Sequence, residues 1–218
     1  MNQTTIHTQS HEAPPKRKVF ISYHHRNDQT YKQALLKFND THGIFIDVSV
    51  DTGDIDVDLS NQAIRKKIRD DYLANSTVTI LLVGTETKYR KHIDWELYSS
   101  MIDGSINKKS GVLVINLPST NCSTFTAAHP NEKEIVHPDC TSWTSVKTRS
   151  EYERRYPYMP DRIIDNLLEP KAKISVVPWS KLTVERLAFL IEATFQARDK
   201  CEYDMSRDMR RSDFNPNS

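Results

Sequence analysis

The sequence predicts an α/β fold built around a parallel sheet, and three features support this prediction. Residues 78–83 form an unbroken apolar run rich in β-branched residues, which is typical of a strand buried on both faces. Further apolar runs occupy 18–23, 44–50 and 111–117. Segments with helical spacing of apolar residues separate these runs, and this alternation is characteristic of parallel strands joined by crossover helices.

The first strand, 18–23, is followed by a helix that we expect to begin at Asn27 or Asp28, since either residue can cap it. Gly43 should end this unit, and the strand at 44–50 should be less buried than 78–83 because it alternates apolar with polar or small residues. The helix carries a stripe at i, i+3, i+4 and i+7: Tyr31, Ala34, Leu35 and Phe38.

Ser60 can cap the next helix, and the strand at 78–83 is followed by a polar loop and a helix. A fifth strand is predicted at 174–177, between a short helix that begins at Pro160 and a last helix capped by Thr183. The apolar residues expected to face the core from the helices around the strand at 78–83 are Ala63, Ile64, Ile68, Tyr72, Leu73, Ile93, Leu97 and Met101.

The length of 218 residues suits one domain with a substantial core. We divide the chain into a mobile N-terminal segment (1–16), a domain (17–200) and a polar tail (201–218) that is expected to fray from Asp204 onward. Within the domain we distinguish a core (17–117), a long insert or loop without sustained periodicity (about 119–170), and the last strand and helix (about 173–200).

Composition excludes several classes of protein. The net charge of +1 gives no reason to expect nucleic acid, and no apolar run approaches the roughly 20 residues of a membrane span. Three cysteines at no recognisable spacing favour a reducing compartment, and without a signal-like start we expect a cytoplasmic protein. Only 5 glycines occur, and neither a P-loop nor a dinucleotide-binding glycine motif is present.

The candidate site lies where the strands of the predicted sheet end, because ligands of open parallel sheets bind beyond the carboxyl ends of the strands. The turn after the first strand offers donors, a cation and aromatic faces for a ribose, a phosphate or a ring. The simpler alternative is a polar turn that only caps a helix. The residues concerned are Tyr23, His24, His25, Arg26 and Asn27.

Glu96 is the acid that follows the central strand, in the helix after the loop at 85–91. His92 lies one helical turn earlier and shares its face, so an ion pair between the two is the structural alternative. Trp95 could pack against the sheet or stack on a ligand ring. A glutamate in this position could also be merely solvated.

Two groups of residues could suggest metal sites, but neither fits a known pattern. The acidic loop at 51–58 lacks the glycine and the terminal glutamate of a calcium loop. Cys122, His129, His137 and Cys140 have no zinc-site spacing, so we expect no metal. A phosphorylated receiver is excluded because the strand at 78–83 does not end in an aspartate.

Taken in order, FISY, TVTILLVG and a helix with tryptophan and glutamate resemble a TIR domain, and more narrowly the TIR-like proteins of Thoeris antiphage defence. The resemblance covers about 17–117. It implies a flavodoxin-like three-layer sandwich with a central parallel five-stranded sheet. Many TIR domains have a tryptophan four residues before the catalytic glutamate, whereas here that position is His92 and the tryptophan is Trp95.

The resemblance implies cleavage of NAD, with Glu96 as the catalytic carboxylate and a nucleotide second messenger as product. NAD would be a substrate, with no tightly bound cofactor, and Tyr23 to Asn27, His92 and Trp95 would line its site. Implied partners are a phage-derived trigger, an effector that senses the product, and further copies of the chain. We expect no membrane partner. The alternative is a non-catalytic TIR module that acts by assembly.

Overall fold

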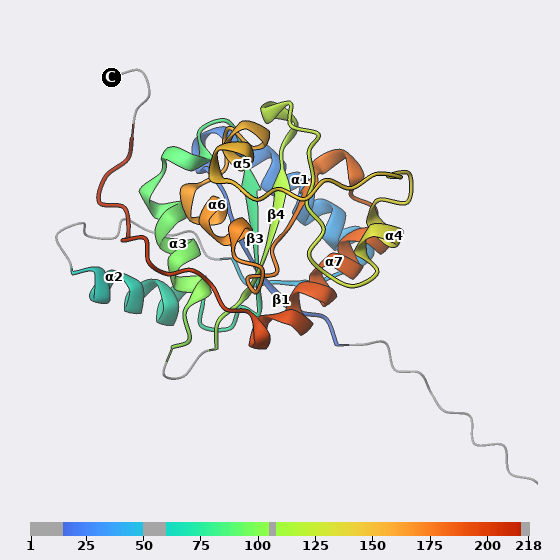
Figure 1. The fold of residues 1–218 in the computed structure, drawn as a ribbon. Coiled ribbons are helices and arrows are strands. Elements are labelled where there is room, and N and C mark those ends of the chain that lie inside the picture. Colours follow the sequence, from blue (N-terminus) through green and yellow to red (C-terminus); the bar gives the residue numbers. More distant parts are fainter. Residues whose placement is uncertain (1–14, 50–59, 105–107, 215–218) are drawn as a thin grey trace, which may run out of the picture.

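A computed structural model describes residues 15–49, 60–104 and 108–214. Its centre is a five-stranded sheet in the order β2-β1-β3-β4-β5, and every neighbouring pair is parallel (Figure 1). This order is that of a flavodoxin-like doubly wound sheet and confirms the predicted fold class. The strands are β1 (Lys18–Ser22), β2 (Ile46–Asp47), β3 (Val78–Val83), β4 (Gly111–Asn116) and β5 (Ser175–Pro178).

The strand predicted at 44–50 is much shorter in the structure. Only Ile46 and Asp47 pair with β1, and both side chains are exposed, as expected for the less buried strand. Beyond this point the hydroxyl of Ser49 accepts a hydrogen bond from the Ile21 backbone N–H at 2.9 Å. A side chain therefore replaces one ladder contact, and regular pairing does not extend over the whole predicted segment.

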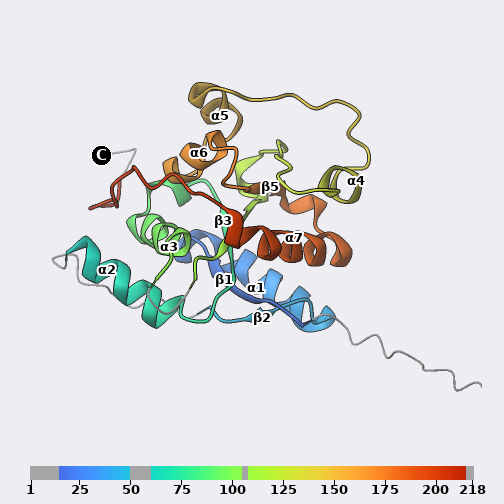
Figure 2. The same ribbon diagram turned by 60° about the horizontal axis from the view of Figure 1, so that its bottom comes forward.

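Helices cover both faces of the sheet (Figures 1 and 2). One face packs against α1 (His25–His42) and α7 (Val184–Ala197), and the other against α3 (Lys91–Met101) and α6 (Asp161–Leu168). On the second face Phe20 also meets Ile64 from α2 (Asn61–Lys67), Ile68 from the π-helical turn after it (Ile68–Tyr72), and Leu73, which caps that turn. Short 3-10 turns occupy Thr87–Tyr89, Pro118–Thr120, Trp179–Lys181 and Arg198–Lys200.

Of the predictions for the two ends of α1, one was confirmed and one was wrong. Gly43 takes a left-handed φ of 62° and ends α1, as predicted. The start of α1 was predicted wrongly: the helix begins at His25, and His24 occupies the capping position without a capping side-chain hydrogen bond. Asp28 therefore lies inside the helix and is 2% exposed, so it is a buried carboxyl rather than a cap.

The insert at 119–170 contains more structure than expected. Besides α6, which begins next to Pro160 as predicted, it contains α4 (Glu132–Val136) and α5 (Arg149–Arg155). Thr148 caps α5 by accepting a hydrogen bond from the Glu151 N–H at 3.3 Å. The insert is tied to the sheet edge by Thr126, which bridges Val176 in antiparallel orientation.

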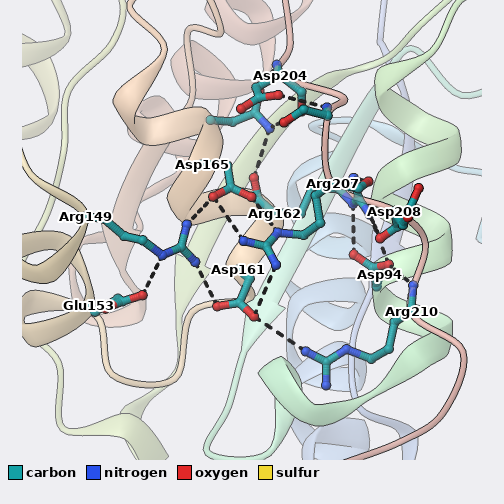
Figure 3. A network of polar contacts seen from close by, with 12 residues as sticks. Asp94, Arg149, Glu153, Asp161, Arg162, Asp165, Asp204, Arg207, Asp208 and Arg210 are labelled. Carbon is teal, nitrogen blue, oxygen red and sulfur yellow. Dashed lines mark hydrogen bonds and ion pairs between the residues drawn. The ribbon is translucent and has the colours of Figure 1, made fainter.

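The expectation that the tail frays from Asp204 does not hold for the described part, which ends at residue 214. Arg162, on α6, is completely buried and donates to both carboxylate oxygens of Asp94 on α3 at 2.8 and 3.1 Å (Figure 3). The same guanidinium donates to the backbone carbonyls of Arg207 and Asp208 in the tail. The tail is therefore fastened across α3 and α6.

Candidate functional site

The candidate site lies where the strand order reverses. β1 is flanked by β2 on one side and β3 on the other, and the helices that follow β1 and β3 leave to opposite faces. Such a switch point leaves a crevice at the carboxyl ends of the two strands. Ser22 ends β1 here, Gly84 follows β3, and α3 brings Glu96 to the same place.

Glu96 is held by a direct contact with the end of β1. The Ser22 hydroxyl donates a hydrogen bond to Oε2 of Glu96 at 2.6 Å, and the two residues are 1% and 2% exposed. A hydroxyl that donates to a carboxylate makes a short, charge-assisted bond, which limits rotation of the carboxylate. Ser22 was not among the predicted site residues, although a serine that ends a buried apolar strand was a usable signal.

Glu96 occupies the second turn of α3, because the helix begins at Lys91. The helix dipole acts mainly within the first turn, where Asp94 is the acidic residue. The helix dipole therefore has only a weak influence on the carboxylate of Glu96. The hydrogen bond from Ser22, by contrast, acts directly on the carboxylate.

Aromatic rings gather one helical turn before Glu96. Tyr23 and His25 stack with centroids 4.4 Å apart, and the His25 ring meets the edge of His92 at 5.9 Å. His92 also forms a hydrogen bond with the Tyr23 backbone. The predicted grouping of the β1 turn with His92 and Glu96 is thus present in the fold, whereas its role in binding stays a prediction.

His24 and His92 are both uncharged at neutral pH. Burial lowers the pKa of His92 to about 4, with a further lowering by the nearby His25. Burial likewise lowers the pKa of His24 to about 4, helped by the charges of Arg90 and Arg26. Nδ1 of His24 and Nε2 of His92 are buried and have no hydrogen-bond partner among the described residues. The site therefore presents neutral imidazoles.

The remaining predicted residues lie outside this group of rings. Arg26 and Asn27 are exposed on the first turn of α1. Trp95 is 3% exposed and packs with Phe20 and Ile68, while its indole N–H donates to the Arg210 carbonyl at 2.7 Å. Of the two roles considered for Trp95, packing is the one that the structure shows.

A second buried carboxyl underlies the crevice. A Cβ at Gly84 would lie 2.4 Å from the carboxylate oxygens of Asp28, so these two residues meet only because position 84 is glycine. Thr87 joins them, since its side chain bonds both to the Gly84 N–H at 2.8 Å and to Asp28. Burial raises the pKa of Asp28 to about 6, despite the opposing effect of Thr87.

Among the described residues no group of three or more His, Cys, Asp or Glu side chains is arranged to hold a metal ion. The acidic loop at 51–58 lies outside those residues. Within the same part of the chain, no helix combines the length and the apolar character that a bilayer span requires.

Residues 20–122 match the family described as Thoeris protein ThsB, TIR-like domain. This segment contains the end of β1, together with β3, β4 and α3, and hence Ser22 and Glu96. The chain therefore contains a TIR-like domain of the Thoeris type, a module of antiphage defence. A comparison with curated proteins finds no match.

Proposed function

We propose that the protein cleaves the N-glycosidic bond of NAD, with Glu96 as the catalytic carboxylate, and produces a signalling nucleotide in antiphage defence. The observation that carries the proposal is the position of Glu96 in a Thoeris TIR-like domain, at the switch point of the sheet and held by Ser22. A carboxylate oriented by a fixed hydroxyl is preorganised, and preorganised charge is the usual source of large catalytic effects.

The chemistry suits a single carboxylate. The bond between C1′ of the ribose and the pyridinium nitrogen breaks, and its electron pair goes to the nitrogen, so nicotinamide leaves as a neutral molecule. No general acid is needed, unlike in hydrolysis of ordinary glycosides. The ribosyl centre becomes oxocarbenium-like, and the negative charge of Glu96 stabilises it. Water or a hydroxyl then adds to C1′ and loses a proton, which yields ADP-ribose, a conjugate or a cyclic product.

The neighbouring rings support this assignment. A cationic His92 would compete for the charge of Glu96, but its low pKa keeps the ring neutral at neutral pH. Tyr23 and His25 form a stacked pair beside His92, and the partly exposed ring of His25 offers a flat face to the substrate. Arg26, exposed on the first turn of α1, supplies a cation for the pyrophosphate.

Access to Glu96 is restricted in this structure. Glu96 is 2% exposed, so a substrate can touch it only after neighbouring groups move aside. We therefore expect the isolated chain to be inactive until a trigger or assembly opens the site. The same burial favours the second candidate function, a non-catalytic TIR module in which the bond from Ser22 to Glu96 only joins β1 to α3.

The test is release of nicotinamide from NAD by purified protein, measured by chromatography with and without lysate from phage-infected cells. The Glu96→Gln variant keeps the size of the side chain and removes its charge, so we expect activity to fall by roughly 10²–10³. Glu134→Gln, an exposed glutamate on α4, is the matched control and should retain wild-type activity.

Equal rates for Glu96→Gln and the wild type would refute the role of Glu96. If neither condition releases nicotinamide, yet both the wild type and Glu96→Gln protect cells against phage, the non-catalytic module is the correct function. Mass spectrometry of small molecules from infected cells that express the chain identifies the product in the catalytic case.

A further inference from the structure

A cavity lies beyond β5, the edge strand of the sheet opposite β2. It has a volume of about 380 Å³ and is bounded by residues 125–127, which run beside β5, by residues 143–146 and by α5. Figure 2 shows the long segment between α4 and α5 on the outside of the molecule. The cavity is separated from the crevice of Glu96 in the strand order, because β4 and β5 lie between them.

One wall of the cavity is a fixed aromatic plate. Phe125 stacks on His137 with centroids 3.9 Å apart, and Trp143 meets the edges of both rings at 5.4 and 5.7 Å. The His137 ring is almost fully buried, and burial lowers its pKa to about 4, so the plate is uncharged at neutral pH. Trp143 is 37% exposed, so part of its ring is accessible from solvent.

Two cationic side chains also line the cavity. Lys133 Nζ lies 4.6 Å from the centre of the Trp143 ring, and Arg155 lines the cavity from α5. A bond to Glu151 at 2.8 Å orients the Arg155 guanidinium. None of the residues that line the cavity is acidic; Glu151 offsets the charge of Arg155, and Lys133 leaves the lining with a net positive charge.

Hydroxyl groups complete the lining. The Tyr156 and Thr126 side chains lie 2.7 Å apart in a hydrogen bond, and both border the cavity. Ligand sites of proteins have volumes from about 300 Å³ upward and combine apolar walls with a few polar groups, and this cavity has both features. The wall residues lie outside the segment 20–122, so the family match does not account for them.

We propose that this cavity binds a nucleotide, with the base against the plate of Phe125 and Trp143 and the phosphate between Lys133 and Arg155. Flat aromatic walls select a planar heterocycle, because base stacking is favourable with any nucleobase. An arginine fork fits phosphate oxygens in a bidentate manner, and a lysine adds a point charge. This site is independent of the NAD chemistry proposed for Glu96.

The test uses the full chain and adenosine monophosphate as the probe, titrated by isothermal calorimetry. We expect saturable binding with one site, and binding at least tenfold weaker for adenosine and for inorganic phosphate, since each probe lacks one half of the recognition. Arg155→Gln and Lys133→Gln should each weaken binding by about tenfold through loss of a charge-assisted contact. Arg154→Gln, an exposed neighbour on α5 that does not line the cavity, should bind as the wild type does.

Two further variants separate this site from the crevice of Glu96. Trp143→Ala removes part of the plate and should weaken binding, whereas Glu96→Gln should leave the affinity unchanged. Circular dichroism checks that each variant is folded. The proposal is overturned if binding does not saturate by about 5 mM, if Arg154→Gln weakens binding as much as Arg155→Gln, or if only Glu96→Gln alters it. The outcome does not depend on whether the chain cleaves NAD.

Discussion

The two sides of α3 treat their buried polar groups in opposite ways. Toward the tail, Asp94 accepts two bonds from Arg162 and a third from the Arg210 backbone N–H at 2.8 Å. Toward the turn after β1, ring nitrogens of His24 and His92 are buried without a partner in the described part of the chain. On the tail side the polar groups form a hydrogen-bonded network. On the side of the β1 turn, the two unpaired ring nitrogens reduce the stability of the fold.

This difference indicates what each side does. Buried polar groups in folded proteins are nearly always hydrogen-bonded, so exceptions need a reason. The network of Asp94 and Arg162 fixes α3 against α6 and the tail. Because α3 is anchored in this way, it can hold Glu96 beside buried ring nitrogens that have no hydrogen-bond partner in the described part of the chain. Local rules are commonly violated at functional sites and satisfied around them.

The largest expected effect comes from removing the anchor. Arg162→Met leaves Asp94 as an uncompensated buried charge, which should cost about 3–5 kcal/mol of unfolding free energy. Urea denaturation followed by circular dichroism measures this loss. Arg207→Met is the matched control: its ion pair with Asp165 is partly exposed, so its loss should cost about 1 kcal/mol or less. Similar losses in the two variants would show that burial does not distinguish this network.

The next effect concerns the close contact between Gly84 and the Asp28 carboxylate. Gly84→Ala places a methyl group 2.4 Å from the Asp28 carboxylate, and overpacking of this kind should cost about 1–3 kcal/mol. In an Asp28→Ala background the clash is absent, so the added cost of Gly84→Ala should nearly vanish. A double-mutant cycle from denaturation curves measures the coupling. Strictly additive effects would show that the two residues do not meet in solution.

The pH dependence of stability should show two opposing contributions from the site side. Histidines with a folded pKa of about 4 and an unfolded pKa of about 6.5 take up protons first in the unfolded chain, so stability falls as pH drops from 6.5 to 4. Asp28 acts in the opposite direction. Its folded pKa of about 6 exceeds the usual 3.8, so its contribution is lost as pH rises from 3.8 to 6.

His92→Asn should therefore flatten the loss of stability on the acid side. Between pH 7.5 and 5 the variant should lose less unfolding free energy than the wild type, by up to about 2 kcal/mol. Urea titrations at both pH values measure the difference, with the exposed His42→Asn as the surface control. Because the pKa of His92 is about 4 and not near the ordinary 6.5, His92 should produce no ionisation of activity near neutral pH. A steeper loss in His92→Asn would contradict the burial of a neutral ring.

The smallest effect tests the attachment of the tail to the start of α3. Asp213 accepts a hydrogen bond from the Lys91 backbone N–H at 2.7 Å and lies 3.6 Å from Arg90. Asp213→Ala removes this cap, and its loss at a partly exposed helix end should cost about 0.5–1 kcal/mol. Thermal denaturation resolves such a shift. Asp199→Ala, which affects only a local surface pair, should have less effect, and equal values would remove the claim that Asp213 caps α3.

The sequence by itself determined the sheet and the position of Glu96. Apolar runs such as 78–83 are buried wherever the chain folds, and helices between them leave few possible topologies. His92 and Glu96 were correctly placed on one face because residues four apart in a helix lie above one another. These inferences depend on neighbours in the chain, which the sequence shows directly.

Only the tertiary structure decided which way the remaining groups face. Trp95 is adjacent to Glu96 in sequence, but successive helical residues point about 100° apart. Trp95 therefore contacts the tail and the π-helical turn, which the sequence did not reveal. The order of the tail depends on Arg162, 45 residues before Arg207, and the burial of Asp28 depends on Gly84. Such contacts join residues far apart in the chain, so the pattern of neighbouring residues in the sequence does not predict them.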